Sequence, residues 1–219
     1  MDGQSNIPEV GCIITFGGYK WRVLDVQGDK ALIITEDIVE SRHYNDVPAN
    51  ITWETCTLRE YLNTEFLDKL DSSRITEATN VNPDNKWFGT SGGNDTVDKV
   101  FLLSIGEVVK YFGDSGALEL TPRPLLQRIL IRLGLKGGSI YEDTSMIDDQ
   151  FGLAREATNH DPGVENEHER HVWYMRSIGC EEGFVTYVSK GGVIWASGIR
   201  AGAGCFAPGG VRPALWLKL

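Results

Sequence analysis

The stretch Gly209-Gly210-Val211-Arg212-Pro213-Ala214-Leu215-Trp216-Leu217 decides the fold. An apolar, strand-forming run near a terminus frays unless a sheet holds it in place. This run is too hydrophobic to lie loose in water, so it predicts a buried strand that closes a sheet. Arg212 carries the one charge in the run, and a buried charge requires a partner.

The segment before this strand, residues 197–208, is rich in glycine and follows no regular pattern. Glycine adopts backbone conformations that other residues avoid. Gly198, Gly202 and Gly204 are therefore expected to set the turns whatever side chains lie between them. A rigid strand that anchors a permissive loop is a common way to build a binding surface.

Other landmarks along the chain complete a pattern with this strand. In chain order they are Ile14-Thr15-Phe16-Gly17-Gly18-Tyr19-Lys20-Trp21, Thr52-Trp53-Glu54, Leu58-Arg59-Glu60-Tyr61-Leu62-Asn63, Asp98-Lys99-Val100-Phe101-Leu102-Leu103-Ser104, Trp173-Tyr174-Met175-Arg176-Ser177 and Gly210-Val211-Arg212-Pro213-Ala214-Leu215. The set resembles a family of uncharacterised bacterial and phage domains with a C-type-lectin-like fold. The resemblance covers nearly the whole chain except about residues 113–170. The family's usual Trp-Trp-Leu-Arg-Ser-Pro-Gly stretch is altered here at Tyr174, Met175 and Ile178.

The resemblance implies a single domain, residues 1–219, that binds a ligand. The same fold occurs in formylglycine-generating (sulfatase-modifying) proteins and in the variable proteins of diversity-generating retroelements. In the latter, a C-terminal segment of rewritten codons forms one exposed face, which would fall here at about residues 189–208. The ligand would be a protein or a glycan. The residues expected to contact it are Ile194, Trp195, Ser197, Arg200, Ala201, Ala203, Cys205 and Phe206.

Two other functions remain open. One is an enzyme of the formylglycine-generating type or a metal-binding protein. The other is a structural module that presents a neighbouring protein on a cell or phage surface. The four cysteines, Cys12, Cys56, Cys180 and Cys205, lack the close spacing of the enzymes' active-site pair, which disfavours catalysis. They are interpreted as reduced thiols, with a Cys180–Cys205 bridge as the alternative.

Composition excludes several other classes of protein. The net charge of −10 argues against a nucleic-acid partner, because phosphate binding needs clustered Lys and Arg. No apolar run approaches the roughly 20 residues of a membrane span. The first residues lack the basic and apolar regions of a signal peptide. These features favour a cytoplasmic protein or one associated with a phage or cell surface.

Pattern also predicts the secondary structure. Residues 13–16, 19–26 and 30–35 are expected to form an antiparallel meander, with tight turns at Gly17-Gly18 and Gly28-Asp29. One helix is predicted from Thr57, capped by Thr57 and Glu60, and another after a buried strand at 100–103, capped by Ser104 and Glu107. The apolar stripe of the first helix comprises Leu58, Tyr61, Leu62, Phe66 and Leu70. Helices packed on antiparallel sheet define an α+β fold.

The insertion at about residues 113–170 departs from the resemblance. A helix is predicted from Pro124 to about Leu133, followed by a long polar excursion. That excursion ends in the densest group of metal-ligand residue types, which includes His160, His168 and His171. The spacing matches no known zinc motif, so the histidines are interpreted as solvated and no cofactor is expected. Asn82-Pro83-Asp84 lacks the Trp-Asn-Asp partner of calcium-dependent lectins.

Two arginines and two tryptophans within apolar strands require separate interpretation. Arg176 and Arg212 are expected to be buried cations, each paired with a carboxylate. Trp173 is expected in the core, whereas Trp195 is a candidate to stack on a ligand.

Overall fold

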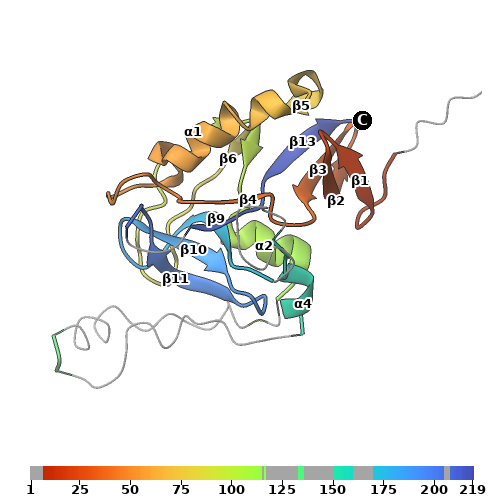
Figure 1. Cartoon of the computed structure of the whole chain (residues 1–219). Coiled ribbons are helices and arrows are strands. Elements are labelled where there is room, and N and C mark those ends of the chain that lie inside the picture. The colour runs from red at the N-terminus through yellow and green to blue at the C-terminus, as the bar shows by residue number, and fades with distance from the viewer. Residues whose placement is uncertain (1–6, 115, 117–132, 136–149, 160–169, 205–207) are drawn as a thin grey trace, which may run out of the picture.

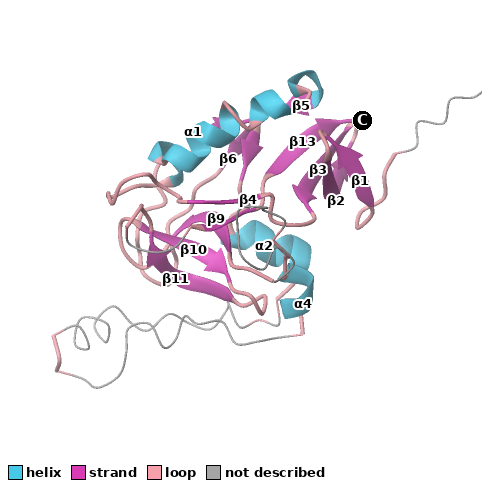
Figure 2. Ribbon diagram, viewed as in Figure 1, coloured by secondary structure: helices cyan, strands magenta, loops and turns pink. Residues whose placement is uncertain are grey.

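The computed structural model describes residues 7–114, 116, 133–135, 150–159, 170–204 and 208–219. The fold is mixed α+β and consists mostly of antiparallel sheet with few helices (Figure 2). Figure 1 shows one sheet at the upper right, a second at the lower left, and helix α1 along the top. No helix among these residues is long and apolar enough to cross a membrane.

The first sheet has the strand order β1-β2-β3-β13-β5, and β8 also pairs with β13. The predicted meander is confirmed, because the first three strands occupy almost the expected residues. Gly28, at φ 62°, makes the tight turn that places Gln27 opposite Lys30. The strands of this sheet are β1 (Ile13–Phe16), β2 (Tyr19–Gln27), β3 (Lys30–Thr35), β5 (Ile75–Thr76), β8 (Val100–Phe101) and β13 (Ala214–Lys218).

The second sheet has the order β11-β10-β9-β12-β4, and a separate two-stranded sheet pairs β6 with β7. In the second sheet β12 runs antiparallel to β4 and parallel to β9. The strands are β4 (Glu40–Arg42), β9 (Trp173–Ile178), β10 (Phe184–Val188), β11 (Ile194–Arg200) and β12 (Gly209–Val211), with β6 (Ala78–Asn80) and β7 (Thr96–Asp98) in the small sheet.

The sequence that decides the fold therefore contributes to both main sheets. Residues Gly209–Val211 form β12 in the second sheet, and after Arg212 and Pro213 the chain enters the first sheet as β13. There Leu215 lies opposite Ile33 on one side and Val100 on the other, with no exposed surface. The prediction of a buried closing strand is confirmed, and the strand lies inside the sheet rather than at its edge.

Helix α2 (Ile105–Phe112) begins as predicted. The Ser104 hydroxyl accepts from the Glu107 N–H, and the Glu107 carboxylate accepts from the Ser104 N–H at 2.7 Å. Val108 and Phe112 are buried on its inner face. Helix α4 (Gly152–Arg155) is short and contacts α2.

The predicted cap of helix α1 (Thr57–Asn63) is wrong. Its N-cap is Cys56, whose sulfur accepts from the Arg59 N–H at 3.4 Å. Thr57 is occupied elsewhere, because its N–H donates to Asn45 Oδ1 and its hydroxyl accepts from the Asp46 N–H. These bonds to the 45–46 loop take the groups that a capping box would need.

Helix α1 is also shorter than its apolar stripe predicts. It ends at Asn63, and the stripe continues through 3₁₀ turns, η2 (Leu67–Lys69) and η3 (Ser72–Arg74). Phe66 and Leu70 are nevertheless buried, so the buried face was predicted correctly although the helix ends before the stripe does. A further turn, η1 (Trp53–Thr55), precedes α1.

Asp98 joins several of the sequence landmarks. Its carboxylate is buried and accepts hydrogen bonds from Trp53 Nε1 (3.0 Å), Arg59 Nε (2.6 Å), Asn80 Nδ2 (2.8 Å) and the Thr96 hydroxyl (2.7 Å). A buried carboxylate is tolerated when its lone pairs are satisfied in this way. The network holds η1, α1 and the β6–β7 hairpin together.

The two buried arginines differ. Arg176 forms the expected ion pair with Glu107 and also donates to the carbonyls of Leu102 and Val81. Arg212 is buried, but the prediction of a carboxylate partner is wrong within the described residues. Its Nε and Nη2 donate to the backbone carbonyls of Thr35 (2.8 Å) and Glu36 (2.9 Å).

Much of the insertion lies outside the described residues, including the helix predicted from Pro124. The described part includes α4 and the bridges that join Thr158 to Arg170 and Asn159 to Ile38. These bridges attach residues 158 and 159 to Arg170 and to Ile38, two residues before β4.

The position of β13 predicts the effect of truncating Leu215. Leu215→Ala is expected to lower the free energy of unfolding by about 2–5 kcal/mol, because it empties a fully buried site between two strands. Chemical denaturation measures this change. Leu219→Ala, at an exposed position four residues away, serves as the control and should leave the midpoint unchanged. Equal midpoints for both variants would contradict the assignment of β13 as the closing strand.

Candidate binding site

Strand β11 forms an edge of the second sheet and carries several of the predicted ligand-contacting residues (Figure 1). Across the strands, Trp195 pairs with Tyr187 of β10, which in turn pairs with Tyr174 of β9. Directly paired residues place their side chains on the same face of a sheet. A row of three aromatic residues therefore crosses the sheet from its edge inward.

Exposure falls along this row. The rings of Tyr187 and Trp195 stack with centroids 5.9 Å apart and planes inclined by 3°, and both residues are half-buried. Tyr174 is buried, accepts a hydrogen bond from the Gly209 N–H at 3.1 Å, and has its pKa raised to about 12 by burial. Tyr187 and Trp195, here called the aromatic edge, are the members of the row that a ligand can reach.

The structure divides the sequence-predicted contact residues by burial. Ile194, Ser197 and Ala201 are buried, so their side chains do not present a surface. Trp195 and Ala203 are half-buried and Arg200 is exposed. Cys205 and Phe206 lie outside the described residues, as does one side of the alternative Cys180–Cys205 bridge.

Backbone contacts fix the glycine-rich segment. Gly202 and Gly204 have positive φ after the end of β11, as predicted, but the prediction of a turn at Gly198 is wrong, because Gly198 lies within β11 where the pairing with β10 is irregular. Gly198 has a φ of 73°, and a Cβ there would lie 2.4 Å from the Val185 carbonyl. Gly202 has a φ of 117° and packs against Pro48 in the same way. The N–H groups of Ala201 and Ala203 donate to the carbonyls of Gly183 (2.7 Å) and Asn45 (3.1 Å). The conformation is thus held by main-chain bonds rather than by the exposed side chains.

Sequence reasoning missed Tyr187. The signal was present, because Gly191-Gly192 marks a turn between two apolar runs. A hairpin folded about that turn pairs Val188 with Ile194 and brings Tyr187 level with Trp195, as observed.

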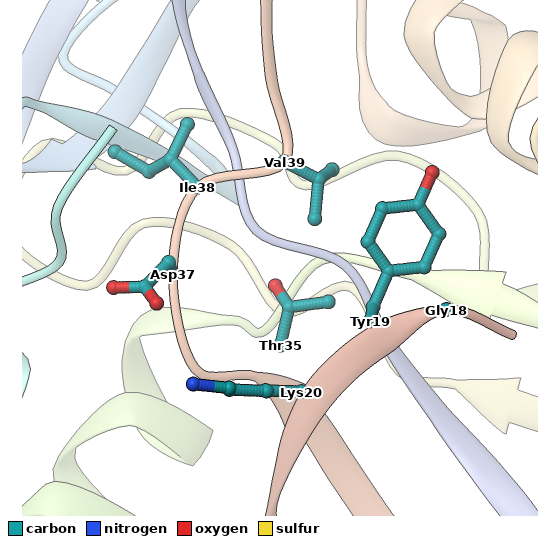
Figure 3. Close-up of a pocket in the computed structure, with 7 residues that line it drawn as sticks. All are labelled: Gly18, Tyr19, Lys20, Thr35, Asp37, Ile38 and Val39. Carbon is teal, nitrogen blue, oxygen red and sulfur yellow. The ribbon is translucent and has the colours of Figure 1, made fainter. Parts of the chain in front are cut away.

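A pocket of about 410 Å³ lies between the start of β2 and the segment that joins β3 to β4 (Figure 3). In Figure 3 Lys20 and Asp37 lie on one side of it and the Tyr19 ring on the other. Asp37 Oδ1 accepts from the Thr158 hydroxyl at 2.5 Å. The Thr35 hydroxyl is buried in the wall, and no described residue hydrogen-bonds to it. This mixture of ammonium, carboxylate and hydroxyl groups suits binding of a polar molecule, and no motif in the sequence predicts the pocket.

The predicted metal-ligand residues are only partly described. His160 and His168 lie outside the described residues, and His171 Nδ1 is 3.1 Å from the Val172 carbonyl oxygen. Among the residues that the structure places, no group of three or more His, Cys, Asp or Glu side chains could hold a metal ion. Cys56 is an unpromising nucleophile, because burial raises its pKa to about 12 and keeps the thiol protonated.

Comparison with known proteins shows the family. Residues 28–219 match the domain of unknown function DUF6273, and the chain belongs to that family. No curated protein and no solved structure matched the chain.

The difference in burial between Ile194 and the outer residues Trp195, Arg200 and Ala203 predicts how substitutions at these positions affect stability. Trp195→Tyr, Arg200→Ser and Ala203→Ser combined should cost about 1 kcal/mol, since surface changes are typically within ±0.5 kcal/mol each. Ile194→Ala alone should cost about 2–5 kcal/mol as a core truncation. Thermal denaturation of both variants measures the difference. If the triple variant were the less stable of the two, the outer residues would belong to the core.

Proposed function

We propose that this domain is a ligand-binding (recognition) module that engages a protein or a glycan through the aromatic edge and the adjoining glycine-rich segment. One observation carries the proposal. Tyr187 of β10 and Trp195 of the edge strand β11 stack in parallel and remain half-exposed, so two aromatic faces lie side by side within reach of a ligand.

The chemistry of the aromatic edge suits recognition. Tyr and Trp combine a large apolar face with a polar tip and few rotatable bonds, so they gain contact area at low entropic cost. Both are enriched among the residues that dominate binding energy. Arg200, exposed at the end of the same strand, adds a donor for polar groups of the ligand.

The C-type-lectin-like fold forms part of the proposal. It is supported by the convergence of the landmarks behind the resemblance, since Trp53, Arg59 and Asp98 meet in one hydrogen-bond network. The closing Gly-Val-Arg-Pro-Ala-Leu stretch, one of these landmarks, joins the two main sheets.

Within this proposal, the domain is the diversified protein of a retroelement. The support is physical: the 198–203 backbone is held by main-chain bonds, so side chains such as those of Trp195 and Arg200 can change without altering its path. The DNA beside the gene provides the test. We expect a reverse transcriptase and an adenine-rich near-copy of the sequence that encodes residues 189–208. Neighbouring DNA with neither feature would overturn the retroelement role and leave ligand binding to its own test.

The binding test uses Trp195→Ala and a matched tryptophan. Labelled protein is applied to an array of bacterial surface glycans and, separately, to immobilised bacterial surface proteins. For any ligand bound by the native protein, Trp195→Ala should weaken binding by about 2 kcal/mol or more, as expected for a central aromatic contact.

Trp216→Ala is the control, because Trp216 is also half-buried but lies on β13 of the other sheet. It should leave affinity unchanged, with folding of both variants checked by circular dichroism. Native-like affinity in Trp195→Ala, or equal loss in both variants, would contradict the assignment of the aromatic edge.

A further inference from the structure

A pocket of about 330 Å³ lies beside helix α2, and most of its accessible surface is apolar. Three parts of the chain form its wall: residues 83–87, one face of α2, and Ser177 and Ile178 at the end of β9. Its volume falls within the range of about 300–1,000 Å³ that is typical of small-molecule sites. The pocket shares no residue with the aromatic edge.

Hydrogen bonds fix two of these walls to the second sheet. The buried Asn85 side chain donates from Nδ2 to the carbonyls of Ile178 (2.8 Å) and Ala196 (2.9 Å), which holds the 83–87 loop in place. At the start of α2 the Ile105 N–H donates to Ser177 Oγ at 3.0 Å. Because both walls are anchored, the pocket is formed before any ligand binds, and binding does not require the walls to be ordered first.

Gly106 keeps the helix side of the pocket open. A Cβ at this position would have Ser104 Oγ, 4.0 Å away, as its nearest described neighbour, and the φ of Gly106 is not positive. Neither a close approach nor the backbone conformation therefore requires glycine here, although glycine is less favourable than alanine in a helix. Gly106 and Val109 lie three residues apart and so share the face of α2 that lines the pocket. A residue that breaks a local rule without a structural gain is expected at a functional site.

The charged residues of the wall do not favour either sign of ligand. Asp84 and Lys86 are exposed and Asp114 is half-buried, whereas Trp87 and Ile178 are buried and apolar. The Lys86 ammonium lies 4.7 Å from the centre of the Trp87 ring. An anion would meet carboxylates and a cation would meet this ammonium, and either would lose hydration in an apolar pocket. An uncharged ligand avoids both costs.

We infer that this pocket is a binding site for a small uncharged organic molecule, whose apolar body lies against Trp87, Val109 and Ile178. The absent side chain at Gly106 leaves the space that this body fills. The inference does not rest on the proposed function, because the two sites have no residue in common.

The test uses naphthylmethanol as the uncharged probe, with naphthoate and naphthylmethylamine as its anionic and cationic analogues. Binding to the ¹⁵N-labelled protein is followed at the Gly106 N–H and Trp87 Nε1–H resonances. Naphthylmethanol should shift both with saturation. The two charged analogues should bind at least about tenfold more weakly, because each must bring a charge out of water. The inference is overturned if naphthylmethanol gives no saturable shift, or if either charged analogue binds as tightly.

Two glycine variants locate the effect. Gly106→Phe places a ring in the pocket from a position with open space and should abolish the shift at Trp87. Gly191→Phe is the control, because Gly191 is also exposed, and a Cβ there would meet no atom within 4 Å. It should bind like the native protein, with folding of both variants checked by circular dichroism. Equal responses from the two variants would place the probe elsewhere and overturn the inference. If Gly106→Phe does not fold, the three probes on the native protein still decide.

Discussion

The central constraint is that one short stretch, residues 209–218, must join two sheets at once. Gly209–Val211 pairs with strands of the second sheet, and Ala214–Lys218 pairs with strands on both sides in the first. Between them Arg212 donates to the carbonyls of Thr35, the last residue of β3, and of Glu36, which follows it. Because strand register is fixed by both partners, a shift in either sheet would disrupt the other. The relative placement of the two sheets follows from this stretch.

A second constraint is the carboxylate of Asp98. Its four donors come from a tryptophan, an arginine, an asparagine and a threonine that are dispersed along the sequence. Such a network is favourable only when every member is present, since a partly satisfied buried network is worse than an apolar core. This explains why separate landmarks occur together in one chain. The bond from Arg59 to Asp98 also fixes the position of helix α1, so the helix does not need to extend beyond Asn63 to be held in place.

The sequence predicted correctly those features that are set by residues close together in the chain. The meander at 13–35 and the cap at Ser104 follow from turns and hydrogen bonds within a few residues. The predicted capping box of α1 was wrong because Asn45 and Asp46, more than ten residues away in the chain, hydrogen-bond to the N–H and the hydroxyl of Thr57. The predicted carboxylate partner of Arg212 was wrong because its partners are the backbone carbonyls of Thr35 and Glu36, and a backbone carbonyl has no sequence signature. In the candidate site, Ile194 and Ala201 were predicted to contact a ligand but are buried. Their burial depends on which face of the second sheet packs against the rest of the domain, and the local sequence does not determine that face.

The order of β13 along the chain has a consequence for synthesis. Its partners β3, β5 and β8 are all made earlier, so their edges stay unpaired until residues 214–218 emerge. Unpaired strand edges in an incomplete chain promote aggregation and degradation. A premature stop or frameshift anywhere in residues 189–208 removes β12 and β13 together. A chain that stops or shifts frame in the glycine-rich segment therefore lacks the strand that completes the first sheet and the strand that joins β4 to β9 in the second.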